Sequence, residues 1–328
     1  MNDTADLRAL LAEARARIAA GHIAEARALL DRLRAEPDGG ALGPPTVLGM
    51  PRKLHAAFLK LAKAEGDVLT RIGLQQTLAP PPDLLAHLGH FTTPERAALT
   101  ESGRAEVPRI LHQIWIGPHP PPETTEAWRR HAARHGLSYR LWREADLAAI
   151  GVDRHPVFQA MAARGDMPGA VDVARYAVLS QVGGIYLDCD WYPARESISF
   201  GDRLPLVGLT CIAEDIPRQT GAGSVLLSNA LIAAPARHPL FARLLDALPA
   251  ALAALPDAPA WWSTGPLLFT VVCRAAAVTI ADAALVAGSA PAGTGRDRIR
   301  ELCAEAEARD AGLLLAWKPW QSAASGHL

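Results

Sequence analysis

The sequence has 328 residues and half of them are hydrophobic, enough to bury a core in one large domain with an appendage or in two ordinary domains. Its 33 Lys and Arg residues nearly balance 34 Asp and Glu residues, so the formal net charge is −1. A near-neutral chain lacks the basic surface typical of nucleic-acid-binding proteins, and no nucleic-acid partner is expected.

The richest apolar segment carries Arg274 and Asp282, and no uninterrupted run approaches the ~18 residues of a transmembrane helix. The N-terminal stretch "MNDTADLRALLAEARARIAAG" is charged throughout and has no apolar signal-peptide core. The cysteines have no C-x-x-C spacing and are typical of reduced thiols in the cytosol. We therefore expect a cytoplasmic protein and leave open a peripheral position at the inner face of the membrane. The cysteines are Cys189, Cys211, Cys273 and Cys303.

Residues 1–104 are predicted to form a helical N-terminal region. The stretch "DLRALLAEARARIAAGHIAEARALLDRLRAE" has apolar residues every three or four positions and is broken at Gly21, which predicts a helical hairpin. A further amphipathic helix is predicted over "RKLHAAFLKLAKAEGDVLTRIGLQ". Nothing in this region indicates chemistry, so we interpret it as a cap or docking module.

The pattern changes near residue 107. "VPRILHQIWIG" and "LSYRLWR" predict strands, and "PETTEAWRRHAARHG" and "EADLAAIG" predict helices. This alternation favours an α/β architecture with a mostly parallel sheet over residues 105–328. In such sheets ligands bind at the carboxyl ends of the strands.

The segment "PGAVDVARYAVLSQVGG" predicts a helix that ends at its two glycines. Asp172 and Arg175 are three residues apart and share one face of this helix. A surface ion pair would have the same spacing. The rest of the helix is apolar and directly precedes a strand, which favours a functional pair.

The next strand, "IYLDCD", places Tyr186, Asp188 and Asp190 on one side, since side chains alternate along a strand. Two carboxylates this close repel each other unless a cation lies between them. Oxygen ligands with this spacing suit Mg²⁺ or Mn²⁺, which also bind phosphate oxygens. A metal ion held there can neutralise a diphosphate and help it leave.

The Asp-x-Asp motif also occurs in two settings without such a site. An acidic turn at the end of a strand would need no ligand. Haloacid-dehalogenase-type phosphatases also carry Asp-x-Asp after an apolar strand, the first Asp being a nucleophile. Their motif continues with Thr or Val where this chain has Tyr192, and it usually lies near the start of the catalytic domain. The metal site is therefore the preferred interpretation.

Segments 107–117, "VPRILHQIWIG", and 170–190, "AVDVARYAVLSQVGGIYLDCD", resemble the DXD-containing sugar-transferase family 32. Relatives of that family include the fungal initiating α-mannosyltransferase, capsular polysaccharide transferases and, more distantly, the large clostridial glucosylating toxins. Segments 227–241 and 263–270 resemble the family's downstream Asn and Thr-Gly-Pro segments. The resemblance covers residues 107–280.

The resemblance implies a GT-A fold, a nucleotide-sugar donor, a divalent cation (Mn²⁺ or Mg²⁺) and transfer of a hexose with retention of configuration. It implies that Asp172 and Arg175 hold the sugar and that Asn229 contacts it. Asp188 would contact ribose and sugar hydroxyls or the metal, and Asp190 would ligate the metal.

For the nucleotide, the resemblance implies that Trp115 stacks on the base with Tyr186 nearby, a contact that suits a flat aromatic ring. Trp320 and Ser322 of the C-terminal segment would complete this part of the site. UDP-hexose is the favoured donor because this arrangement resembles that of the toxins, and GDP-mannose also fits. The acceptor would be a glycan, a lipid-linked molecule or a protein, as in polysaccharide biosynthesis.

Two departures from the family's pattern leave a second class of function open. Val171 stands where the family usually has Ser, and the C-terminal "LLLAWKPWQSAASGHL" has no His in register with the family's metal-closing segment. Lys318 could contact a phosphate there, and His327 could supply the missing ligand. The preferred prediction is a glycosyltransferase domain over residues 105–328. The alternative is a non-catalytic sugar- or protein-binding module on the same fold.

Overall fold

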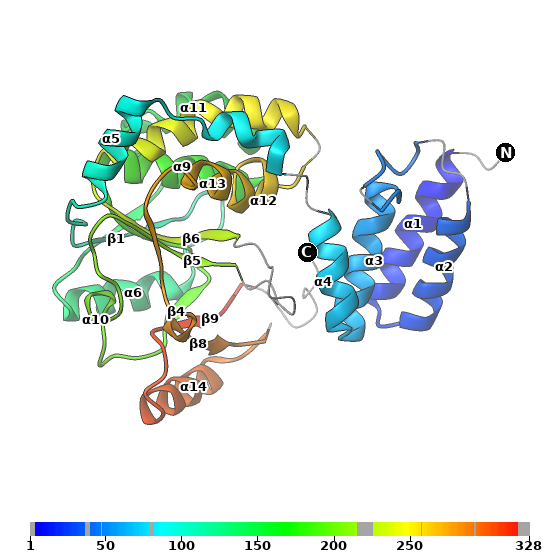
Figure 1. Cartoon of the computed structure of the whole chain (residues 1–328). Helices are drawn as coiled ribbons and strands as arrows, with labels where there is room; N and C mark the ends of the chain where they lie inside the picture. The colour runs from blue at the N-terminus through cyan, green and yellow to red at the C-terminus, as the bar shows by residue number, and fades with distance from the viewer. Residues whose placement is uncertain are drawn as a thin grey trace. The chain divides into compact units, whose positions relative to one another are not determined.

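The computed structural model describes residues 4–36, 40–46, 48–78, 80, 82–214, 226–256, 258–291 and 293–320. Contacts within the chain divide it into two compact units, one formed by residues up to 81 and the other mainly by residues from 82 onward. The first unit is helical and the second is an α/β unit (Figure 1).

The first unit is built from helices whose apolar sides pack together. The predicted break at Gly21 is confirmed: α1 (Thr4–Ala19) ends before it, α2 (Ile23–Ala35) begins after it, and Gly21 has a φ of 78°. α3 (Arg52–Glu65) and α4 (Val68–Leu78) follow. The core of this unit includes Leu7, Leu11, Leu30, Leu33, Leu54 and Leu61.

Two helical segments before residue 105 belong to the second unit. η1 (Pro82–Gly89), a 3₁₀ helix, and α5 (Thr93–Ser102) both contact α11 (Pro239–Ala254), and η1 also contacts α13 (Pro266–Cys273). Across this contact, Arg243 forms an ion pair of 2.5 Å with Glu95 and lies 4.9 Å from the centre of the Phe91 ring. The predicted boundary between residues 104 and 105 therefore falls inside the second unit.

The second unit is built on a mixed sheet in which only one of the described strands runs against the others. Its strands are β1 (Ile110–Ile114), β2 (Ser138–Trp142), β3 (Gly184–Leu187), β5 (Leu209–Ala213), β6 (Leu227–Ala234) and β7 (Val278–Ile280). They are ordered β2-β1-β3-β6-β5-β7, and β6 is antiparallel to both of its neighbours. The remaining pairs are parallel, as the alternation of strands and helices predicts.

Helices cover both faces of this sheet (Figure 1). α9 (Met167–Val182), α11, α13 and the short α12 (Ala260–Ser263) lie on one face, and α6 (Glu123–Arg134) and α10 (Phe200–Arg203) lie on the other. α7 (Glu144–Ala149), η2 (Val152–Arg154) and α8 (Pro156–Ala163) connect β2 to α9. The predicted fold class, α/β with an α-helical N-terminal region, is confirmed.

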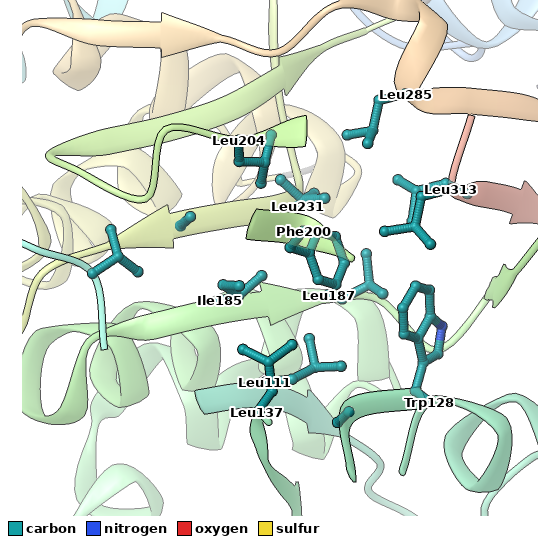
Figure 2. Packing of buried hydrophobic residues seen from close by; sticks show 14 of the residues in the cluster. Leu111, Trp128, Leu137, Ile185, Leu187, Phe200, Leu204, Leu231, Leu285 and Leu313 are labelled. Atoms are coloured by element: carbon teal, nitrogen blue, oxygen red, sulfur yellow. The ribbon is translucent and has the colours of Figure 1, made fainter. Parts of the chain in front are cut away.

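The face toward α6 carries a cluster of buried apolar side chains (Figure 2). Trp128 of α6 stacks on Phe200 of α10 with 5.3 Å between the ring centres. Ile185 and Leu187 of β3 point into this cluster, so the side chain of Tyr186 between them points to the opposite face, toward α9. Other members are Leu111, Leu137, Leu204, Leu231, Leu285 and Leu313.

The two glycines between α9 and β3 are required by close backbone contacts. Gly183 has a φ of 66°, and a Cβ there would lie 2.3 Å from the Ala236 nitrogen. Gly184 has a φ of 103°, and its Cβ would lie 2.7 Å from the Ile110 carbonyl oxygen. Only glycine fits both the conformation and the space. β3 then ends at Leu187, earlier than predicted, because the chain turns through residues 188–190.

A small second sheet brings the C-terminal segment to this turn. It consists of β4 (Trp191–Pro193), β8 (Val286–Ser289, after the 3₁₀ turn η3, Ala283–Leu285) and β9 (Leu314–Ala316), with β9 in the middle. β4 follows the turn directly and pairs antiparallel with β9. α14 (Arg296–Ala308) packs its apolar side against this sheet. Within the described ranges, no helix is both long and apolar enough to cross a membrane.

Candidate active site

Asp188 lies at the carboxyl end of β3, the end of the strand at which ligands bind in α/β sheets. Its N–H donates to the Ala230 carbonyl at 2.8 Å, and Gln113 Nε2 donates to the Asp188 carbonyl at 3.2 Å. The Tyr186 hydroxyl donates to Asp188 Oδ1 at 2.6 Å, so these two side chains converge as the strand spacing predicts. The Asp188 side chain remains 28% exposed and can meet a ligand.

Arg175 is the buried cation of this site. Its guanidinium contacts Oδ1 of both Asp172 (3.0 Å) and Asp188 (3.2 Å). It also donates to the Asn229 carbonyl at 2.5 Å and lies 4.6 Å from the centre of the Tyr186 ring. Burial opposes the charged form, but the neighbouring Asp188, Tyr186 and Asp172 raise the pKa of Arg175, so it stays protonated.

Asp172 is buried and held on both carboxylate oxygens. Besides Arg175, Asn229 Nδ2 donates to Oδ1 at 2.8 Å and the Thr264 hydroxyl donates to Oδ2 at 2.7 Å. Burial raises the pKa of Asp172, and these three donors act in the opposite direction. The structure therefore brings Asp172, Arg175 and Asn229 together in one hydrogen-bonded network.

The sequence reasoning missed two members of this network, Thr264 and Tyr176. The Tyr176 hydroxyl accepts from Asn229 Nδ2 at 3.1 Å and donates to the Thr264 carbonyl at 2.9 Å. Gly265 leaves room for the Asp172 carboxylate beside Thr264, since a Cβ at residue 265 would lie 3.0 Å from Asp172 Oδ2. The resemblance of residues 263–270 to the family's Thr-Gly-Pro segment indicated this part of the site, but it did not identify the Thr264 hydroxyl as a contact of Asp172.

Asp188 and Asp190 form an electrostatically unfavourable pair. Burial raises the pKa of Asp188, and the negative charges of Asp190 and Asp172 raise it further, against the effect of Arg175 and Tyr186. A cation beside the two carboxylates would stabilise their charged forms. This is the electrostatic condition that the predicted metal site requires.

Asp190 is held by the segment after β9. The Trp317 N–H donates to the Asp190 carbonyl at 2.7 Å, and Lys318 Nζ lies 3.4 Å from Asp190 Oδ2. Counting charged groups, Asp172, Asp188 and Asp190 face Arg175 and Lys318, which leaves one negative charge. That balance suits the binding of a cation.

The carboxylate oxygens fit a divalent cation. In the described structure, Tyr186 and Arg175 use Oδ1 of Asp188 and Lys318 uses Oδ2 of Asp190, so one oxygen of each carboxylate is left for a metal ion. No cluster of three or more His, Cys, Asp or Glu side chains that could hold a metal is present among the described residues. Phosphate oxygens and water would have to complete the coordination.

Two indole rings contact each other where β1 and the segment after β9 end. Trp115 follows β1 and its ring centre is 5.2 Å from that of Trp320, at an interplanar angle of 59°. The Trp320 residue is 44% exposed. Tyr186 is buried beneath Arg175 instead of facing outward. The predicted nucleotide contact Ser322 lies outside the described residues, as does His327.

The family model "Glycosyltransferase sugar-binding region containing DXD motif" matches residues 123–205, which include Asp172, Arg175 and the Asp188–Asp190 turn. A comparison with curated proteins gave no significant match.

Two solved structures are similar to this chain at low sequence identity. The PaToxG glycosyltransferase is 16% identical, with 58% of this chain and 76% of that chain covered and a TM-score of 0.41. The catalytic domain of alpha-toxin from Clostridium novyi is 9% identical, with 70% and 84% covered and a TM-score of 0.34.

The family match agrees with the geometry. The matched region contains α6, β2, α9, β3 and β4, and thus both the Asp-x-Asp turn and the helix that supplies Asp172 and Arg175. Residues 123–205 of the α/β unit thus match a DXD-containing glycosyltransferase region, and the predicted resemblance to this kind of enzyme is confirmed.

Proposed function

We propose that this protein is a metal-dependent, retaining hexosyltransferase that uses a nucleotide sugar. The observation that carries the proposal is the pair Asp188 and Asp190 at the end of β3, set beside the buried network of Asp172 and Arg175. One arrangement thus offers carboxylates for a cation and fixed polar groups for a sugar.

Asp188 and Asp190 would hold Mn²⁺ or Mg²⁺ through the oxygens that other side chains leave available. When bound, such a cation neutralises the diphosphate that leaves the sugar. Tyr186 and Arg175 orient Asp188 for this role by fixing its Oδ1 atom. We infer that they position the carboxylate and that Asp188 also accepts from ribose or sugar hydroxyls.

Asp172, Arg175 and Asn229 would form the sugar-binding side of the site. Each is at most 5% exposed and is held by the other two, so their polar atoms do not need to reorganise when the donor binds. Fixed dipoles and charges of this kind stabilise charge that develops during a reaction. Thr264 and Tyr176 would act through Asp172 and Asn229 as positioning residues.

Trp115 and Trp320 would contact the nucleotide base, because their rings lie together, Trp320 follows Lys318 by two residues, and flat aromatic rings suit stacking. UDP-hexose remains the favoured donor and GDP-mannose the second choice. We propose a glycan, a lipid-linked molecule or a protein as acceptor, with polysaccharide biosynthesis in the cytoplasm as the setting.

A non-catalytic sugar- or protein-binding module is the second candidate. The contact between Lys318 and Asp190 favours it to some extent, because an ammonium group already lies beside the second carboxylate. The match of residues 123–205 to a glycosyltransferase region favours transfer over both this module and a phosphatase.

The proposed activity is tested by incubating the full chain with UDP-glucose, UDP-galactose, UDP-N-acetylglucosamine or GDP-mannose and Mn²⁺. Release of free nucleoside diphosphate is followed by chromatography, since water can replace the acceptor slowly. The expected result is release from at least one UDP-sugar, with loss of the signal in EDTA and in Asp190→Asn. No release from any donor would favour the binding module, and release from GDP-mannose alone would overturn the preference for UDP.

A further inference from the structure

Lys318 is placed beside the carboxylate pair by the backbone. β9 pairs antiparallel with β4 so that Ala316 lies opposite Trp191, and the Trp317 N–H to Asp190 carbonyl bond of 2.7 Å extends this pairing by one residue. Residue 318 therefore lies next to the Asp-x-Asp turn whatever its side chain does.

The direction of the Lys318 side chain follows from its neighbours. The Trp317 indole is buried, donates from Nε1 to the Thr294 carbonyl at 3.2 Å and packs edge-on against Tyr192 with 5.6 Å between the ring centres. Since side chains alternate in extended backbone, Lys318 points to the opposite side, toward Asp190. Pro319 comes next and favours an extended conformation at residue 318.

The contact that Lys318 makes is loose. Its Nζ is 3.4 Å from Asp190 Oδ2, longer than a normal charged hydrogen bond, and the two side chains are 48% and 30% exposed. Exposed ion pairs of this kind are weak because water screens them. The ammonium group can leave Asp190 at little cost if a stronger anion arrives or if a metal ion takes the carboxylate.

The other cation of the site cannot move in this way. Arg175 is 4% exposed and its guanidinium is bonded to two carboxylates and a carbonyl. A donor diphosphate brings about two negative charges and gains more as the sugar leaves, so cationic groups stabilise it in the transition state. Of the two, only Lys318 has both an exposed head and a flexible stem.

We propose that Lys318 binds the diphosphate of the donor, and that its ammonium group moves from Asp190 to the phosphate oxygens when the nucleotide and metal bind. This inference rests on the proposed function and adds to it a phosphate-binding residue. No covalent step is involved: one ion pair is exchanged for another.

The test is calorimetric titration of the full-length protein with UDP and with uridine, in the presence of Mn²⁺, for the parent, Lys318→Met, Lys318→Arg and the control Arg309→Met. GDP and guanosine replace them if GDP binds the parent more tightly. Arg309 is a good control because it is also an exposed cation paired with a carboxylate, Glu305, but lies at the end of α14. Thermal unfolding verifies that each variant is folded.

Lys318→Met is expected to weaken UDP binding by about tenfold to a hundredfold, the range for a lost hydrogen bond between charged groups, and to leave uridine binding unchanged. Lys318→Arg should restore most of the affinity, and Arg309→Met should match the parent. UDP binding by Lys318→Met within twofold of the parent would overturn the inference, as would an equal loss for UDP and uridine. If the parent itself binds no nucleoside diphosphate, the proposed function fails together with this inference. If the parent binds UDP and Lys318→Met binds it equally well, only this inference fails.

Discussion

Thr264 offers a test of the buried network, and the stability part of that test needs no knowledge of the donor. Its hydroxyl donates to Asp172 Oδ2 at 2.7 Å and is itself fully buried. Thr264→Val removes this donor and leaves the volume of the side chain nearly unchanged, so no cavity forms. Asp172 then keeps its charge in a buried environment with one hydrogen bond fewer.

The expected cost is about 1.5–3 kcal/mol in the free energy of unfolding, because the acceptor is a charged group. The pKa of Asp172, which burial already raises, should rise further, since the Thr264 hydroxyl is one of the groups that lower it. Donor turnover should fall by about tenfold or more, because the carboxylate is less firmly held. Urea-induced unfolding and nucleotide release measure the two effects.

Thr264→Ser is the matched control, because it keeps the hydroxyl and should stay within ~1 kcal/mol of the parent. A double-mutant cycle with Asp172→Asn isolates the contact: in that background Thr264→Val should cost much less, since the carboxylate is gone. Equal costs of Thr264→Val in both backgrounds would refute the assignment of Thr264 as the residue that holds Asp172.

Two further predictions concern stability. Burial lowers the pKa of His112 from 6.5 to about 4, and this outweighs the opposite effect of the Gly183 carbonyl 2.8 Å from Nε2; the neutral ring accepts at Nδ1 from Trp142 Nε1 at 3.1 Å. As the pH falls, the His112 ring of the unfolded chain is therefore protonated before that of the folded chain, so up to about 3 kcal/mol of stability is lost between pH 6.5 and 4. In urea unfolding, the stability of His112→Asn should depend less steeply on pH over this range. Deletion of residues 1–81 should leave a soluble α/β unit, whereas deletion of residues 1–104 removes η1 and α5 from α11 and α13 and should cause aggregation, which size-exclusion chromatography measures. Aggregation of both truncations would contradict this division of the chain.

Local patterns were sufficient for the parts of the site that are close in sequence. Asp172 and Arg175 share a helix face because they are three residues apart, and their contact of 3.0 Å follows from that spacing. Tyr186 and Asp188 meet because side chains two apart lie on one side of a strand. The Gly183–Gly184 stop was recognised as the end of a helix, although its second cause, the close approach of neighbouring backbone, is not visible in the sequence.

The contacts that the sequence did not predict join distant segments. Thr264 is 92 positions from Asp172, and no periodicity relates them. In the sequence, the segment from η1 to α5 is predicted to be helical, like α1 to α4. Nothing in its pattern indicates that η1 and α5 pack on α11 and that η1 also packs on α13, which makes the segment part of the second unit. Lys318 meets Asp190 only because β9 pairs with β4, and short strands such as these carry little pattern.

The most direct test of the central claim, that the Asp188–Asp190 turn holds a metal ion and a nucleotide, is calorimetric titration with UDP in Mn²⁺ and in EDTA. The parent is compared with Asp190→Asn, which keeps the size of a metal ligand but removes its charge, and with Asp297→Asn, whose side chain is 91% exposed on α14. The account predicts that Mn²⁺ strengthens UDP binding in the parent and in Asp297→Asn, and that this gain falls at least tenfold in Asp190→Asn while all three proteins bind alike in EDTA. An undiminished Mn²⁺ effect in a folded Asp190→Asn variant would contradict the metal site.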